Sequence, residues 1–379
     1  MSNMDALFDA VAQRGHVCLG LDTALEYLPP SVQGNAPSPA EAILAFNRAI
    51  IDATIDLAAC FKVQIAYYEA LGLAGLQTYA LTLAYLRERG ALVIADIKRS
   101  DIADTARAYA RAHFQGDFEA DFVTLNPYLG MDTLEPWLEH ADQRGKGAFV
   151  LMRTSNPGRS DLQLQELKGG SPPLAADPLR DPKKRGEPAV RSVSSATSPP
   201  GGEAPKPPPP GQQLCDLVGS LLAQLAEGRT GRSGYASFGA VVGVDAQSPA
   251  ERDAAMEIRT RYPQLFFLIP GYGAQGGAAS DAALLLRQGN GGVVNASRSI
   301  LRAWQSQAPS LQSQTPASQS QAPASQSQAP ASQSSPAETP AGASPAGPGS
   351  AKADLIFAAQ AARQAVITMR DAIRAAAEG

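Results

Sequence analysis

Eight short apolar runs, separated by longer segments, are the feature that most constrains the fold of this 379-residue chain. Continuous apolar runs of this length are typical of strands that are buried on both faces. The runs are HVCLGLD (16–22), ACFKVQI (59–65), LVIADIK (92–98), FVTLN (122–126), AFVLMRTS (148–155), FGAVVGV (238–244), FFLIP (266–270) and GGVVNAS (291–297).

Between most of these runs lie about 10 to 20 residues with helical spacing, such as PAEAILAFNRAIIDATIDLA and SPAERDAAMEIRTRYP. Strands that alternate with helices predict a parallel sheet covered on both faces. Eight such units predict a closed (β/α)8 TIM barrel in a single domain of α/β class. An open doubly wound sheet is the alternative, but the GxGxxG motif expected after its first strand is missing.

Two low-complexity segments interrupt the alternation. Residues 169–211 contain twelve prolines and no aromatic residue, and residues 305–350 repeat QAPASQS almost without charge. Neither can bury enough apolar surface to offset its ordering entropy, so both are predicted to be disordered inserts. The PPPP run in the first insert suits either a ligand for a proline-reading module or a plain extended linker. Residues 1–168, 212–304 and 351–379 then form the barrel.

Composition excludes several classes of protein. The net charge is only −4 with scattered basic residues, so neither nucleic acid nor an anionic membrane is expected as a partner. Three dispersed cysteines and three histidines predict neither a disulfide framework nor a metal site. No signal peptide or membrane-length apolar run is present, which favours a cytoplasmic protein.

Polar residues collect where the predicted strands end, which is where barrels of this type place their sites. Asp22 ends the first strand and Lys62 lies on the second. Asp96 and Lys98 end the third, and Ser155 ends the fifth. Taken singly, Asp22 could form a turn and Lys62 could extend along a strand end to solvent.

The densest of these clusters is ADIKRSD, which spans Asp96, Lys98 and Asp101. Positions two apart on a strand share a face, so Asp96 and Lys98 should lie together. Asp101 is expected to start the next helix, with Thr105 one turn further, although Asp101 could serve only as an N-cap. A lysine between two carboxylates stays protonated, which makes Lys98 a candidate proton donor.

An anion site is predicted at the last two strands. The seventh strand runs into PGYGAQGG (270–277), whose glycines allow backbone N–H groups to approach an anion closely. Arg298 follows the eighth strand and offers a bidentate guanidinium. Barrels of this type often bind phosphate after strands seven and eight. A glycine-rich turn next to a surface arginine would give the same sequence pattern without binding an anion.

Four motifs, ADIKRSDIADTARAYA, MRTSNPG, LIPGYGAQGG and VNASRSI, together resemble the orotidine 5′-phosphate decarboxylase family, in its longer-chain type 2 branch. The resemblance covers the barrel segments and keeps the motifs in order. It implies conversion of orotidine 5′-monophosphate (OMP) to UMP and CO2 in de novo pyrimidine biosynthesis, without metal or organic cofactor. It also implies a homodimer of barrels with sites shared between the subunits.

The resemblance further implies a role for each matched residue. Lys98 would protonate C6 of the pyrimidine, with Asp96 against the substrate carboxylate and Lys62 completing a Lys-Asp-Lys-Asp array. Asp101 would reach in from the neighbouring subunit, beside Ile102 and Thr105. The implied substrate contacts are Asp22 and Lys62 for ribose, Ser155 and Pro270 for the pyrimidine, and Gly271, Gln275, Ser297 and Arg298 for the phosphate.

Two other functions stay open at this point. Mg²⁺-dependent sugar-phosphate decarboxylases and hexulose-phosphate synthases share the Asp-x-Lys-x-x-Asp element, but they carry an acidic residue on the second strand, where this chain has Lys62. A catalytically inactive barrel that displays the two inserts to partners is the other. An unused cluster of buried charges would be costly to keep, which argues against that scaffold.

Overall fold

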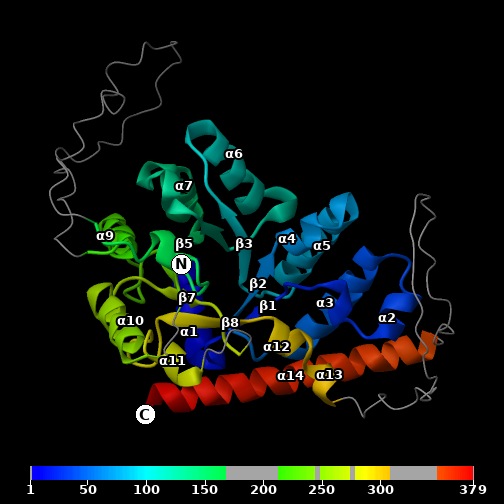
Figure 1. Cartoon of the computed structure of the whole chain (residues 1–379). Helices are drawn as coiled ribbons and strands as arrows, with labels where there is room; N and C mark the ends of the chain where they lie inside the picture. Colours follow the sequence, from blue (N-terminus) through cyan, green and yellow to red (C-terminus); the bar gives the residue numbers. More distant parts are fainter. Residues whose placement is uncertain (1, 168–211, 244–247, 274–277, 308–347, 379) are drawn as a thin grey trace, which may run out of the picture.

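The computed structural model describes residues 2–167, 212–243, 248–273, 278–307 and 348–378 (Figure 1). The first predicted insert, most of the second, and Gln275 lie outside these residues. Helix α13 ends at Gln307 and helix α14 begins at Pro348, so both extend a few residues into the range predicted as the second insert.

The eight strands close into a parallel barrel in sequence order, which confirms the predicted fold. Every apolar run forms one strand, and β1 pairs with β8 through Val17 and Val294 to complete the ring. The strands are β1 Val17–Gly20, β2 Cys60–Gln64, β3 Val93–Arg99, β4 Phe122–Leu125, β5 Gly147–Arg153, β6 Phe238–Val242, β7 Phe267–Ile269 and β8 Gly292–Ala296.

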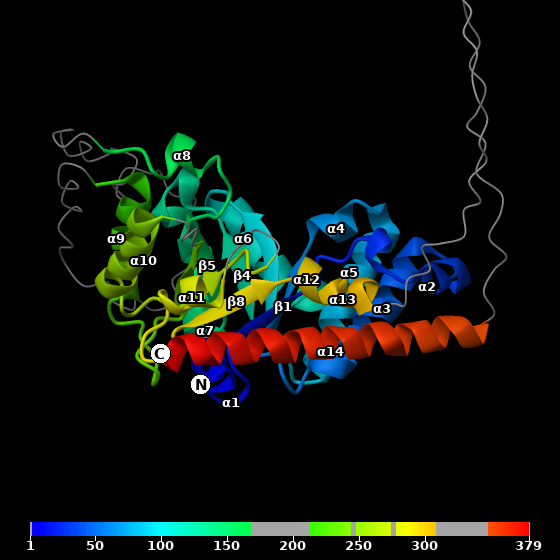
Figure 2. The same cartoon turned by 60° about the horizontal axis from the view of Figure 1, so that its bottom comes forward.

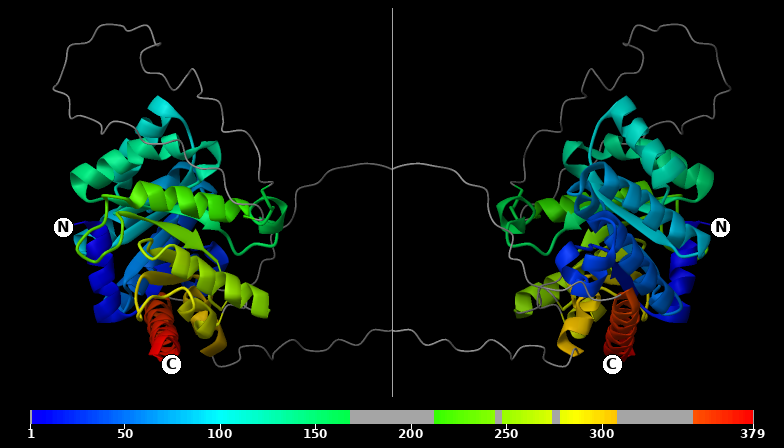
Figure 3. Two further views of the ribbon diagram at one scale, coloured as in Figure 1. Left: turned by 90° about the vertical axis from the view of Figure 1, so that its left-hand side faces the viewer. Right: turned by 90° about the vertical axis from the view of Figure 1, so that its right-hand side faces the viewer.

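Helices surround the barrel, as Figures 1 and 3 show. Their periodic apolar faces bury residues such as Phe46 and Ile50 of α3 against the strands. The longer helices are α1 Asn3–Arg14, α2 Pro30–Asn35, α3 Pro39–Thr54, α5 Gly72–Glu88, α6 Ala103–Phe114, α7 Glu135–Arg144, α9 Leu214–Ala226, α10 Pro249–Arg261 and α14 Pro348–Glu378. The short ones are α4 Ala66–Glu69, α8 Arg159–Leu162, α11 Ala279–Ala283, α12 Arg298–Leu301 and α13 Ala303–Gln307.

Helix α1 covers the amino ends of the strands. Its first residue, Asn3, donates its backbone N–H to Gly145 O at 2.7 Å, just ahead of β5. Met4, Leu7 and Val11 of α1 belong to a buried cluster with strand residues such as Phe149. Because this end is packed, the carboxyl ends of the strands are left to form a site.

Helix α14 supplies the last helix of the barrel and runs along α3, α11, α12 and α13 (Figure 2). It buries Ala362, Val366, Met369 and Ile373 in the main core. Its carboxyl end lies beside α1, where Arg374 Nη2 donates to Gln13 O at 3.4 Å. No helix in the part of the chain that the structure describes is long and apolar enough to cross a membrane.

Candidate active site

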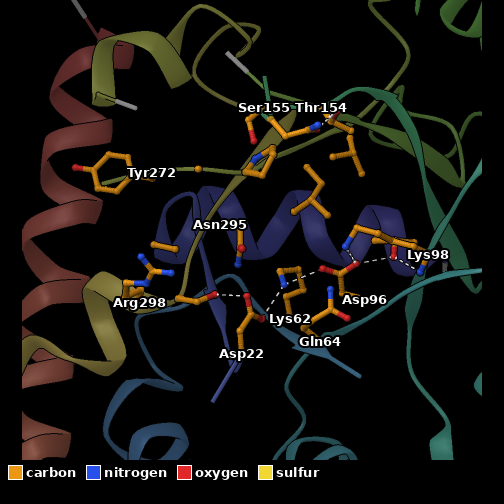
Figure 4. Close-up of a pocket in the computed structure, with 18 of the residues that line it drawn as sticks. Asp22, Lys62, Gln64, Asp96, Lys98, Thr154, Ser155, Tyr272, Asn295 and Arg298 are labelled. Carbon is orange, nitrogen blue, oxygen red and sulfur yellow. Dashed lines mark hydrogen bonds and ion pairs between the residues drawn. The ribbon is translucent and has the colours of Figure 1, made fainter. Parts of the chain in front are cut away.

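A pocket of about 400 Å³ opens at the carboxyl ends of the strands. Polar and charged side chains on and after the strands line it, and Figure 4 shows several of them. Its described lining includes Asp22, Tyr27, Lys62, Gln64, Tyr67, Asp96, Lys98, Thr124, Thr154, Ser155, Asn156, Pro270, Gly271, Tyr272, Asn295, Ser297 and Arg298.

Lys62 lies at the centre of a row of alternating charges. Its Nζ is 2.9 Å from Asp22 Oδ1 and 2.9 Å from Asp96 Oδ2, and only 6% of its side chain is exposed. Burial alone would lower the pKa of Lys62, but the two carboxylates outweigh it and hold that pKa above its ordinary value. The lysine is therefore a permanent cation, rather than a side chain extended along a strand end to solvent.

Asp96 continues the row toward Lys98. Its Oδ1 accepts from Lys98 Nζ at 2.6 Å and from Thr124 Oγ1 at 2.7 Å. Burial acts to raise the pKa of Asp96, but the ammonium groups of Lys62 and Lys98 hold it well below the usual range. Asp96 is thus an anion at every pH at which the protein would work.

A backbone irregularity in β3 joins Lys98 to Asp96. The pairing of β3 with β4 shifts between Ala95 and Arg99, and Lys98 has a φ of 46°, which is uncommon for a residue other than glycine. Thr124 Oγ1 of β4 accepts the N–H groups of Ile97 at 3.0 Å and Lys98 at 2.9 Å. Asp96 and Lys98 are together as predicted, but through this bulge rather than a regular pleat.

Lys98 does not lie between two carboxylates within one chain. Its ammonium contacts Asp96, and 46% of its side chain is exposed at the pocket mouth. Asp101 directs its Oδ1 to Ile102 N at 2.8 Å instead. The described lysine held by two acids is Lys62, so the sequence argument applies to that residue.

The predicted start of the helix after β3 is wrong by two residues. Helix α6 begins at Ala103, and Ile102 is at its N-cap position without a side-chain cap, so Asp101 is not an N-cap. Asp101, Ile102 and Thr105 are absent from the described lining of the pocket. Ile102 is 58% exposed, and Thr105 is exposed as well.

Asp22 connects the row to the last strand. Its Oδ2 accepts from Ser297 Oγ at 2.9 Å. The Ser297 side chain occupies the space beside Gly20, since a Cβ on Gly20 would lie 1.9 Å from Ser297 Oγ. Asp22 after β1 therefore links Lys62 on β2 to Ser297 after β8, and so does more than form a turn.

The described residues predicted to bind an anion lie at the opposite end of the pocket. Figure 4 shows Arg298 at one end of the row and Lys98 at the other. Gly271, with a φ of 92°, and Ser297 line the wall near Arg298. A hydrogen bond to Tyr27 raises the pKa of Arg298, which stays a cation. Gln275, predicted to help here, lies outside the described residues.

Ser155 and Pro270 also line the pocket, and Figure 4 shows Ser155 above the charged row. The backbone of the segment after β5 is fixed by its own neighbours. Thr154 N donates to Gln163 Oε1 at 2.8 Å, and Thr154 Oγ1 donates to Asn156 Oδ1 at 2.6 Å. The structure thus brings Ser155 into the same pocket as the charged row.

Sequence reasoning missed several lining residues. Thr124 interrupts the apolar run FVTLN, Gln64 ends β2, and Asn295 lies on β8 with Nδ2 donating to Cys18 O at 3.0 Å. A polar residue within an otherwise apolar strand was the available signal for all three. Tyr27 ends a short 3-10 helix, Tyr67 lies in the one-turn helix α4, and Tyr272 follows β7, so none of them belongs to a segment long enough to show a periodic pattern.

The donor set of this pocket does not suit a divalent cation. Its described carboxylates are the buried Asp96 and the partly exposed Asp22, and the Lys62 ammonium already lies between them. Among the residues that the structure describes, no group of three or more His, Cys, Asp or Glu side chains could hold a metal ion. A bound Mg²⁺ would have to displace or repel that lysine.

The fold and pocket define a class: a (β/α)8 barrel with a row of alternating charges at the carboxyl ends of its strands and an arginine, Arg298, in the same pocket. Comparison with known proteins narrows that class. Residues 15–196 match the family model described as Orotidine 5′-phosphate decarboxylase / HUMPS family. The orotidine 5′-phosphate decarboxylase of Clostridium acetobutylicum is 46% identical over 304 residues, which cover 80% of this chain and 90% of that protein.

Solved structures agree. The Leishmania donovani OMP decarboxylase superposes with a TM-score of 0.55 at 28% identity, covering 80% of this chain and 91% of that one. Leishmania donovani UMP synthase gives a TM-score of 0.56 at 29% identity, and the match spans about half, 52%, of that longer chain. This chain belongs to the orotidine 5′-phosphate decarboxylase family, as its motifs predicted.

Proposed function

We infer that this chain decarboxylates OMP to UMP and CO2, a step of de novo pyrimidine biosynthesis. The observation that carries the inference is the continuous row Asp22–Lys62–Asp96–Lys98, which shares one pocket with the Arg298 cradle. A nucleoside monophosphate that bears a carboxylate needs both features. The charged row meets the reacting end, and the cradle meets the phosphate.

Lys98 is the proton donor in this proposal. Loss of CO2 leaves electron density at C6, and in this proposal the Lys98 ammonium, which contacts Asp96, is the cation that meets that charge. Two unit charges about 4 Å apart interact by roughly 4 kcal/mol at an effective dielectric of 20. That is on the order of a thousandfold in rate, so the remaining acceleration must come from binding and positioning.

Asp96 supports Lys98 and faces the substrate carboxylate. Lys62 keeps Asp96 ionised and, together with Asp22, binds the ribose hydroxyls. Because these charges are already in place, the side chains need little reorganisation as negative charge develops on the substrate.

The rest of the pocket holds the two ends of the nucleotide. Arg298, with backbone N–H groups near Gly271 and Ser297 and the predicted Gln275, binds the 5′-phosphate. Ser155 hydrogen-bonds the pyrimidine edge, and Pro270 packs beside it. Binding energy at the phosphate is then used to hold C6 against Lys98.

A homodimer with shared sites explains the residues that stay outside the pocket of one chain. Asp101 and Thr105 would enter the partner's site and complete the row beyond Lys98. Large apolar side chains are exposed after β2, β3 and β4, namely Leu73 at 82%, Ile102 at 58%, Tyr128 at 76% and Leu129 at 50%. An apolar rim of this kind is typical of a protein–protein interface.

The cytoplasmic location suggested by the sequence stays a prediction.

Release of CO2 from OMP labelled at its carboxylate tests the proposal, with the full chain assayed in EDTA and again with added Mg²⁺. We expect equal turnover in both, because Lys62 occupies the place of a cation. Turnover that requires Mg²⁺ would favour the sugar-phosphate class. No release under either condition would favour an inactive scaffold.

A further inference from the structure

Two arginines flank the segment that carries Ser155, and both bind one glutamate of another element. Arg153 ends β5, and Arg159 begins α8 after the segment. Arg153 Nη2 lies 2.7 Å, and Arg159 Nη2 3.1 Å, from the same oxygen, Oε2 of Glu251. Glu251 is in the first turn of α10, which follows β6. The cluster therefore links the segment after β5 to the first turn of α10.

The charges in this cluster are unequal and shielded from water. The side chains of Arg153 and Arg159 are 4% and 10% exposed, and that of Glu251 is 25% exposed. Two guanidinium groups thus share one carboxylate. Removing that carboxylate would leave two nearly buried like charges facing one another, which is far more costly than losing a surface ion pair.

The same arginines contact the backbone of two residues next to Ser155 in space, Thr154 and Gly243. Arg159 Nη1 donates to Thr154 O at 3.4 Å, and Arg153 Nη1 donates to Gly243 O at 3.3 Å. Gly243 in turn packs on Ser155, since a Cβ there would lie 2.7 Å from Ser155 N. A shift of either arginine would therefore move the Ser155 backbone.

We propose that Glu251 is a positioning residue: through Arg153 and Arg159 it holds the Thr154–Ser155 segment where it recognises the pyrimidine base. None of the three charged residues is among the described residues lining the pocket, so they act through Ser155 rather than on the nucleotide. The proposal rests on the role inferred above for Ser155. It adds that base affinity depends on a carboxylate outside the pocket.

Equilibrium binding of UMP and of ribose 5-phosphate to Glu251→Gln tests this proposal by calorimetry. UMP uses the Ser155 segment, whereas ribose 5-phosphate uses only the sugar and phosphate contacts. We expect UMP to bind more weakly by about tenfold or more, because a lost charge-assisted hydrogen bond changes an affinity by at least that factor. Ribose 5-phosphate should bind as it does to the wild type. Glu257→Gln is the matched control, because Glu257 lies on the same helix and pairs with Arg261 at the surface. It should change neither affinity.

Arg159→Gln is the second variant and leaves a one-to-one pair of Arg153 with Glu251. It should also weaken UMP selectively, and it decides the question if Glu251→Gln does not fold. UMP affinity that stays unchanged, or an equal loss for both ligands, would overturn the proposal. Because no turnover is needed, this result is separate from the CO2 assay: an inactive wild-type chain would reject the proposed reaction, whatever Glu251 does.

Discussion

The site depends on single residues whose surroundings fix their charge. Lys62 and Asp96 each gain more from their oppositely charged neighbours than they lose by burial. The sequence predicted these residues because they are charged side chains within or at the end of apolar runs. It could not predict Thr124 as the partner of the Ile97 and Lys98 amides, because that contact needs the β3 bulge, which has no signature in ADIKRSD.

Arg298 is expected to bind phosphate, so Arg298→Ala should raise KM for OMP by about 10- to 100-fold, the size of a lost charge-assisted hydrogen bond. The value of kcat should change less. Steady-state kinetics measure both constants. Arg302→Ala is the control, because Arg302 packs on Tyr27 near the pocket but does not line its described part. An unchanged KM in Arg298→Ala would remove Arg298 from the site.

At the level of elements, strands were easier to predict than helix starts. A continuous run of apolar residues indicates a buried strand, and each of the eight predicted runs forms one strand. Helix α6 begins two residues later than predicted because Asp101 bonds its own neighbour, Ile102 N, and leaves the turn uncapped. Local side-chain to backbone bonds of this kind compete with capping, and sequence alone does not rank them.

Helix α6 also carries a titratable group that links stability to pH. Burial, with a contribution from the nearby Arg99 charge, lowers the pKa of His113 to about 4. Between pH 6.5 and 4 the unfolded chain takes up a proton that the folded chain does not, so acid favours unfolding. From pH 7 to 4 the free energy of unfolding should therefore fall by about 3 kcal/mol more in the wild type than in His113→Leu. Urea titrations at both pH values measure this difference, and an identical pH dependence would refute it.

At the scale of the whole molecule, counting alternating elements was enough to predict a closed barrel, because eight strand–helix units have few other ways to cover a parallel sheet. The docking of α14 against α3 and α11 follows from its apolar face and confirms the last helix. The sequence could not predict which apolar side chains are available to the proposed second copy, because that depends on which of them remain exposed after folding. Leu73, Ile102 and Tyr128 emerge as exposed only in the structure.

Shared sites predict that two inactive chains can rescue each other. In a mixture of Lys98→Ala and Asp101→Ala chains, half of the dimers are mixed, and one site in each mixed dimer carries both wild-type residues. Activity should recover to about a quarter of that of the wild type, as an isologous dimer requires. Subunit exchange is verified by co-purification with a tag on one variant. Exchange without recovery would place Asp101 in the site of its own chain or outside any site.

Turnover of OMP by Lys98→Ala, measured beside its affinity for UMP, tests the central claim that this ammonium supplies the proton at C6. We expect kcat to fall by about a thousandfold or more, with UMP affinity changed by less than about tenfold, because Lys98 acts on the developing charge rather than on the bound nucleotide. Lys352→Ala, on the exposed part of α14, should behave as the wild type. Turnover of Lys98→Ala within about tenfold of wild type would contradict the assignment.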